Sequence, residues 1–116
     1  MLLESHFGVP AAGAVLVALN VRLKPEELSS FVRHAGVGLL LCDEGVAETG
    51  RADADAASPA LPLVVDSGAA GPYEQMLEEA QPLLRPLDDE RGLLAINYTS
   101  GTTGTWAVTA AGGKQR

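Results

Sequence analysis

The chain has 116 residues, of which 47% are hydrophobic and 4% aromatic, and it carries a net charge of −7. This length and apolar content favour one small globular domain over a disordered chain, although the shortage of large side chains weakens its core. The negative charge argues against binding to nucleic acid or to an anionic membrane surface, because both reward clusters of Lys and Arg. It does not exclude a nucleotide, which needs only local hydrogen-bond donors.

The sequence also bears on the cellular compartment. A single cysteine, Cys42, cannot form an internal disulfide and fits a reducing compartment. The first residues lack the basic region and the small-residue cleavage site of a signal peptide, and the longest apolar run, Val9 to Leu19, is too short to span a membrane. We therefore expect a cytoplasmic protein without a transmembrane segment.

Two helices are expected in the first third of the chain. Residues 11–19 are apolar on every side and rich in alanine, which predicts a helix buried on most faces, with Pro10 in its first turn. Pro25 predicts the start of a second helix over residues 25–35, and Gly36 predicts its end. The apolar face of this second helix has positions at helical spacing, namely Leu28, Phe31, Val32 and Ala35.

The rest of the chain alternates apolar runs with polar stretches, which predicts an α/β fold, a partial sheet with covering helices. The expected strands lie at residues 37–42, 61–65 and 93–98. The run 37–42 is apolar throughout and predicts a strand covered on both faces. Residues 73–80 repeat the helical spacing, whereas residues 44–60 are polar and repetitive and predict a flexible surface loop.

The last expected strand runs directly into a segment made only of hydroxyl residues and glycine, Thr99-Ser100-Gly101-Thr102-Thr103-Gly104. Two glycines allow a tight turn and close approach to a ligand, and the hydroxyls add uncharged donors, which is the chemistry of a phosphate cradle. Composition alone leaves a plain Ser/Thr/Gly hairpin loop equally open. The segment is not a Walker-type loop, because no Lys-Ser or Lys-Thr pair follows at the required spacing.

The histidines, the cysteine and the acidic run of the sequence indicate neither a catalytic residue nor a metal site. His6 and His34 are the only residues that titrate near neutrality, and neither has a partner for a triad or a metal. Cys42 lies in an apolar run with no neighbouring base, so it is expected to pack as a small apolar residue. The acidic run at residues 88–90 could bind a divalent cation, but a solvated loop explains it more simply.

The segment from Ile96 to Gly104 resembles the phosphate-binding signature of the adenylate-forming enzymes, the AMP-dependent synthetase and ligase family that includes the acyl-CoA synthetases. Nine consecutive residues match this signature. Upstream, residues 6–16, 19–23 and 25–28 are similar to the corresponding part of fatty-acyl-CoA synthetases. After Gly104 the family continues with any residue and then Pro-Lys-Gly, whereas this chain reads Thr-Trp-Ala-Val. Lys114 lies too far along the chain to stand for the family's lysine.

This resemblance implies that residues 1–104 are a fragment of the large N-terminal domain of an adenylate-forming enzyme, ending in the phosphate loop. Residues 105–116 are then expected to be an unrelated or disordered tail. The resemblance further implies ATP, Mg²⁺ and coenzyme A as cofactors and a fatty or other carboxylic acid as substrate. It implies that Thr99, Ser100, Gly101, Thr102, Thr103 and Gly104 contact the nucleotide.

Two functions remain open from the sequence. The first is an enzyme that activates a carboxylic acid as an acyl-adenylate and transfers it to coenzyme A. The second is a non-catalytic remnant with weak or no nucleotide binding, because one phosphate loop supplies only part of such an active site. Pro-Lys-Gly following Gly104 in a longer reading frame would favour the first.

Overall fold

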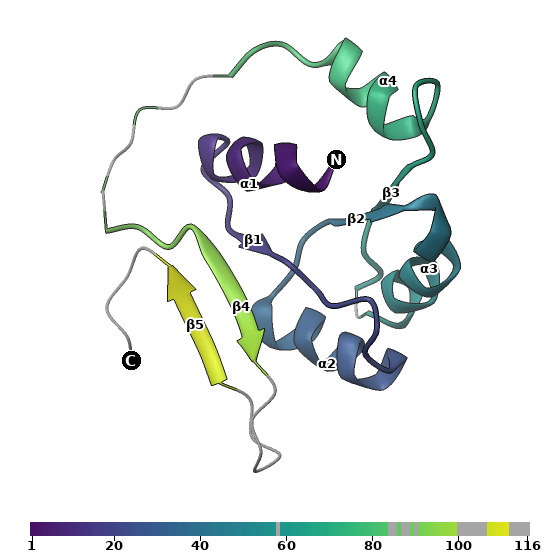
Figure 1. Ribbon diagram of the computed structural model, residues 1–116, viewed down its shortest axis with the longest axis vertical. Helices are drawn as coiled ribbons and strands as arrows, with labels where there is room; N and C mark the ends of the chain where they lie inside the picture. The colour runs from purple at the N-terminus through teal and green to yellow at the C-terminus, as the bar shows by residue number, and fades with distance from the viewer. Residues whose placement is uncertain (58, 84–85, 87–88, 90, 100–106, 112–116) are drawn as a thin grey trace. The chain divides into compact units, whose positions relative to one another are not determined.

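A computed structural model describes residues 1–57, 59–83, 86, 89, 91–99 and 107–111 (Figure 1). The chain divides into two compact units. The first unit combines Met1–Leu19 with Leu83–Arg116, and the second is Asn20–Pro82. Both units mix helices with strands, so the expected α/β class is confirmed, but the strands belong to two separate sheets and not to one.

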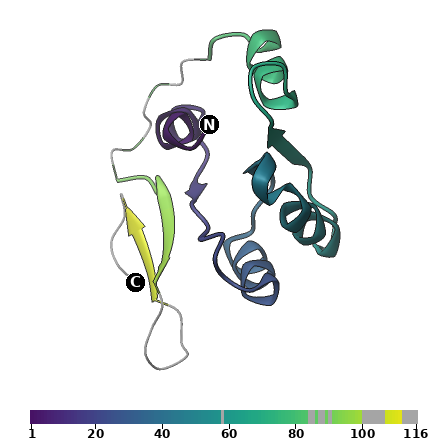
Figure 2. The same ribbon diagram turned by 45° about the vertical axis from the view of Figure 1, so that its right-hand side comes forward.

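The first unit brings the start of the chain together with its last strands. Helix α1 (Leu2–Ala11) leads into the short strand β1 (Leu16–Val17), and strands β4 (Ala95–Thr99) and β5 (Ala107–Ala111) follow much later in the chain. The sheet order is β1-β4-β5, with β1 parallel to β4 and β5 antiparallel to it. Figure 2 shows β4 and β5 lying side by side along their whole length.

The expected helix over residues 11–19 is wrong. The helix lies earlier, and Pro10 is in its last turn and not its first. The chain leaves α1 through Gly13, whose φ of +78° is accessible to glycine at little cost. Leu16 and Val17 then pair in parallel with Ala95 and Ile96, and the Leu16 N–H donates to the Leu94 carbonyl at 3.0 Å. Pairing with a distant strand therefore overrides the helical preference of an alanine-rich segment.

The described residues of the second unit form two parallel strands and three α-helices. Along the chain it has α2 (Pro25–Ala35), β2 (Leu40–Asp43), the 3₁₀ turn η1 (Glu44–Val46), α3 (Ala47–Ala56), β3 (Leu63–Asp66) and α4 (Pro72–Glu79). The strands β2 and β3 are parallel, with Leu40 facing Leu63 and Asp43 facing Asp66. Helix α3 makes the connection between them, so this part is a β-α-β unit.

The buried apolar residues of the second unit come from four elements. They are Leu28, Phe31 and Val32 of α2, Ala54 of α3, Val64 of β3 and Tyr73 of α4. Three of the four residues predicted for the inner face of α2 are thus buried. The helix also begins and ends as expected, because the Lys24 N–H donates to Glu27 Oε2 at 3.1 Å and Gly36 closes it with a φ of +64°.

The expected flexible loop over residues 44–60 is also wrong, because most of it forms η1 and α3. Alanine is the strongest helix former, and it occupies alternate positions in the second half of α3, at Ala52, Ala54 and Ala56. Two of its residues face the interior: Ala54 is buried, and Asp53 is only 7% exposed. Asp53 Oδ1 accepts a hydrogen bond from Ser29 Oγ of α2 at 2.8 Å, which fastens α3 to its neighbour.

The strand boundaries are shifted by one to three residues from those expected. Strand β2 starts at Leu40 and not at residue 37, β3 runs over residues 63–66 and not 61–65, and β4 runs over residues 95–99 and not 93–98. Strand β2 is half-buried along Leu40 to Cys42 and exposed at Asp43, so it is not covered on both faces within this chain. Helix α4 matches its prediction to within one residue.

Candidate nucleotide-binding site

The candidate site begins at the carboxyl end of β4. Thr99, the first residue of the hydroxyl and glycine segment, is the last residue of this strand. The other five predicted site residues, Ser100, Gly101, Thr102, Thr103 and Gly104, lie outside the residues that the structure describes. The structure therefore shows that the segment begins at the carboxyl end of β4. The contacts of its residues with a ligand remain a prediction.

Both ends of the segment 100–106 are held by one strand pair. Strands β4 and β5 are consecutive and antiparallel, with register pairs from Ala95 facing Ala111 to Thr99 facing Ala107. Facing residues in an antiparallel ladder have Cα atoms about 4.5–5.5 Å apart. The chain must therefore leave β4 at Thr99 and return at Ala107 within that distance. The pairing of β4 with β5 is compatible with both alternatives that composition leaves open, a hairpin loop and a phosphate cradle.

The residues of β4 alternate between its two faces, as a strand requires. Ile96 and Tyr98 are half-buried, whereas Asn97 between them is exposed. Burial raises the pKa of the Tyr98 phenol above its ordinary value of 10.0. The less exposed face of β4 thus carries Ile96 and Tyr98, and Tyr98 immediately precedes the hydroxyl and glycine segment.

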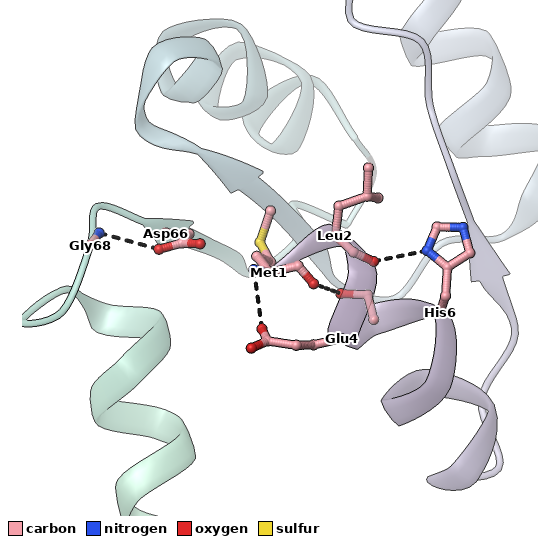
Figure 3. Close-up of polar contacts among 7 residues, drawn as sticks. Met1, Leu2, Glu4, His6, Asp66 and Gly68 are labelled. Carbon is pink, nitrogen blue, oxygen red and sulfur yellow. Dashed lines mark hydrogen bonds and ion pairs between the residues drawn. The ribbon is translucent and has the colours of Figure 1, made fainter.

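Among the residues that the structure describes, the other groups considered from the sequence lie in separate places. His6 is exposed on α1, where its Nδ1 lies 2.8 Å from the Leu2 carbonyl oxygen (Figure 3). Cys42 is half-buried in β2, and burial together with the negative charge of Asp43 raises the pKa of its thiol. Of the acidic run 88–90 only Asp89 is described, and its Oδ1 accepts the Arg91 N–H at 2.9 Å in a turn.

A pair of aspartates that the sequence analysis did not single out lies at the carboxyl ends of the parallel strands β2 and β3. Asp43 and Asp66 face each other in the register of these strands. Asp66 Oδ1 accepts the N–H of Gly68 at 3.2 Å, which shapes the turn before α4 (Figure 3). The apolar runs predict each strand separately, but not which residues face each other across them.

Neither a metal cluster nor a membrane-spanning helix is present in the part of the chain that the structure describes. There, His, Cys, Asp and Glu side chains do not gather in groups of three or more that could hold a metal ion. No described helix is both long enough and apolar enough to cross a membrane.

Comparisons with known proteins show which family the chain belongs to. A family model described as "AMP-binding enzyme" matches residues 1–106. The long-chain-fatty-acid–CoA ligase of Thermus thermophilus is 36% identical over 107 residues, covering 88% of this chain and 19% of the relative. The 4-hydroxybutyrate–CoA ligase 2 of Metallosphaera sedula is 31% identical over 115 residues, covering 88% of this chain and 21% of the relative.

Solved structures support the fold. ATP-bound MatB from Rhodopseudomonas palustris superimposes with a TM-score of 0.79 at 23% identity, covering 96% of this chain and 22% of that protein. The anthranilate–CoA ligase AuaEII, solved with anthranoyl-AMP, gives a TM-score of 0.73 at 24% identity, covering 93% of this chain and 21% of that protein. The two units thus have the fold of a part of these enzymes.

The chain belongs to the AMP-binding family of adenylate-forming enzymes. It spans about a fifth of the length of the curated relatives that it matches. The match to the family model ends at residue 106, two residues beyond Gly104.

Proposed function

We propose that the chain is part of an ATP-dependent acid–CoA ligase and carries the loop that holds the triphosphate of ATP. The observation that carries this proposal is the position of the hydroxyl and glycine segment, which starts at the last residue of β4 inside the region matched by the family model. The complete enzyme would activate a fatty or other carboxylic acid as an acyl-adenylate and then transfer the acyl group to coenzyme A. The names of the relatives, which are CoA ligases for several acids, support this reaction class.

The chemistry assigned to the chain itself is limited to binding and orienting phosphate groups. Backbone N–H groups of the segment and the hydroxyls of Thr99, Ser100, Thr102 and Thr103 would donate hydrogen bonds to the triphosphate, and Gly101 and Gly104 would let the backbone come close. Mg²⁺ would accompany the nucleotide and offset its charge, and coenzyme A would accept the acyl group. The chain supplies no group that we assign as a catalytic acid, base or nucleophile.

A second candidate is a non-catalytic polypeptide with weak or no nucleotide binding. The observation that favours it is the sequence after Gly104 and Thr105, where Trp106, Ala107 and Val108 stand in place of the family's Pro-Lys-Gly. We retain as a proposal that residues 105–116 are unrelated to the family, although five of them form β5. A cytoplasmic location also remains a proposal, since some relatives are named as peroxisomal.

Calorimetric titration of ATP·Mg²⁺ into the chain tests the assignment. We expect weak binding that disappears in Gly101→Val, because a branched side chain disfavours positive φ and keeps the backbone away from the phosphates. Each hydrogen bond to a charged group contributes about 1.5–3 kcal/mol, so losing several at once removes measurable affinity. Thr102→Val removes one hydroxyl that its neighbours partly replace, and it should cost less.

Lys114→Ala is the matched control, because it removes a charge outside the proposed site. We expect it to leave the affinity for ATP·Mg²⁺ nearly unchanged. Binding that survives Gly101→Val but is lost in Lys114→Ala would place the site in the tail and overturn the proposal. An unaltered chain that binds no ATP would favour the second candidate.

A further inference from the structure

Helix α1 buries a polar residue and exposes apolar ones. Its buried residue is Ser5, whose Oγ donates to the Met1 carbonyl at 3.1 Å. Leu3 and Phe7 are 75% and 73% exposed, the two highest values among the described large apolar side chains. Residues four apart share one face of a helix and residues two apart do not, so Leu3 and Phe7 form an apolar face on the side away from Ser5.

The other described residues of the first unit also bury little apolar surface. All six buried apolar residues of the described chain belong to the second unit, and the first unit has none among its described residues. Val15, Leu93 and Leu94, which lie just before strands β1 and β4, are exposed as well. Burial of apolar surface is the main favourable term in folding. The described part of the first unit therefore lacks an apolar core of its own, and the exposed face of α1 is available for packing.

The size and charge of this face distinguish between the surfaces that could cover it. A stable complex with a second copy of the chain needs about 20–30 residues from each partner, whereas α1 exposes three large apolar side chains. An anionic lipid surface attracts Lys and Arg, and α1 contains neither. Packing within one longer polypeptide loses no translational freedom, so a small apolar face is sufficient for it.

The length of the relatives indicates which longer polypeptide this is. The chain spans about a fifth of the CoA ligases that it matches, so most of such an enzyme lies beyond the matched part. We propose that the apolar face of α1, formed by Leu3 and Phe7, is an interface that packs against the remainder of an adenylate-forming enzyme. This proposal rests on one part of the proposed function, namely that the chain is part of a ligase, and it does not depend on the assignment of the phosphate loop.

Hydroxyl-radical footprinting of the unaltered Phe7 side chain tests the proposal. The full chain is compared with a chimera in which residues 1–104 replace the matching region of the Thermus thermophilus ligase. We expect oxidation of Phe7 to be at least about fivefold slower in the chimera, because packing removes the ring from solvent. Tyr73 is buried in the chain itself and should react slowly in both proteins, which controls for folding. Equal rates at Phe7 would overturn the proposal, and so would a chimera that does not fold although the relative does.

Two substitutions on α1 form a matched pair for the same test. Phe7→Ser removes an apolar contact of the proposed interface, whereas Glu4→Ser changes an exposed carboxylate that would be costly to bury and is expected to stay in solvent. In the isolated chain both should leave the urea midpoint nearly unchanged, because both side chains are exposed. In the chimera we expect Phe7→Ser to lower the Tm by about 3 °C or more and Glu4→Ser by less than about 1 °C. Equal shifts in the chimera would overturn the proposal.

Sedimentation equilibrium of the unaltered chain tests whether a second copy covers the face. We expect a monomer in which Phe7 is oxidised rapidly. A dimer in which Phe7 is protected would identify a second copy as the cover and overturn the proposal, and protection of Phe7 in the monomer would overturn it too. Protection of Phe7 in the chimera, together with no affinity of the chain for ATP, would support this interface and overturn only the assignment of the phosphate loop.

Discussion

The buried carboxylate of Asp53 depends on a hydroxyl donated by another helix. Asp53 is 7% exposed, and Ser29 Oγ donates to its Oδ1 at 2.8 Å. Ser29→Ala removes this donor and leaves the buried carboxylate oxygen without this hydrogen bond. The loss should lower the free energy of unfolding by about 1–3 kcal/mol. Urea denaturation measures the loss. Ser30→Ala makes the same change one residue further along α2, and an equal loss there would show that the hydrogen bond to Asp53 contributes nothing specific.

The single cysteine gives a pH dependence whose direction follows from its surroundings. Burial first, and then the negative charge of Asp43, raises the pKa of the Cys42 thiol above 9.0, while Arg51 lowers it. The folded state therefore holds the thiol proton more tightly than the unfolded chain does, so the contribution of Cys42 to stability is unchanged below about pH 9 and is lost as pH rises through the folded pKa.

The rate of alkylation of Cys42 with iodoacetamide as a function of pH checks this direction, because only the thiolate reacts. We expect the folded chain to reach its half-maximal rate at a higher pH than the same chain in urea. Asp43→Asn removes one of the two causes and should move the folded profile back toward the unfolded one. A folded profile that coincides with the profile in urea would contradict the effect of burial.

Helix α2 is the element whose two ends the sequence predicts best, and its C-terminal glycine can be tested directly. Gly36 has a φ of +64°, and nothing lies within 4 Å of the position that a Cβ would take there, so an alanine would meet backbone strain but no clash. Gly36→Ala should therefore destabilise the chain by about 1–2 kcal/mol, the cost of the left-handed conformation. Gly38→Ala is the control, since Gly38 has equal space without a positive φ. Urea midpoints that shift equally for both would contradict this explanation.

The contrast between α2 and α3 shows what local patterns can and cannot predict. Helix α2 has a proline at its start, a glycine after its end and large apolar residues at helical spacing, so every local signal agrees. Helix α3 buries no large apolar side chain: its buried residues are Asp53 and Ala54, and a Cβ on Gly50 would lie 3.1 Å from Cys42 Sγ. Alanines alternating with aspartates give little helical periodicity in hydrophobicity, although their helix propensity was a usable signal.

The strands show a different limit, because their partners are far away in the sequence. The runs before Asp43, Asp66 and Thr99 are apolar enough to predict strands, but sequence alone does not say that two of them pair with each other while the third joins Leu16 and Val17. Strand β1 has only two residues, and its extended form depends on β4, which follows much later in the chain. Such pairing is tertiary information that no local window contains.

At the scale of the whole molecule, the hydroxyl and glycine segment was recognisable because its residues are consecutive and chemically unusual. The surrounding architecture was not, since the first unit is built from both ends of the chain and the second unit is the continuous stretch between them in the sequence. The family match covers this segment and ends at residue 106. The antiparallel pairing of β5 with β4 could be seen only from the structure.

A polypeptide of these 116 residues should not form acyl-CoA from ATP, a fatty acid and coenzyme A. Acyl transfer requires the acid, the nucleotide and the thiol to be held within reacting distance, and much of the acceleration comes from that positioning. The chain offers one proposed phosphate-binding segment and no assigned acid, base or nucleophile, so binding of ATP would not by itself lower the barrier. Coupled assays of pyrophosphate release and chromatographic detection of acyl-CoA measure the outcome, with the long-chain-fatty-acid–CoA ligase of Thermus thermophilus as the positive control. Pyrophosphate release that requires both the polypeptide and the fatty acid would contradict the prediction, because it would show that these residues complete the adenylation step alone.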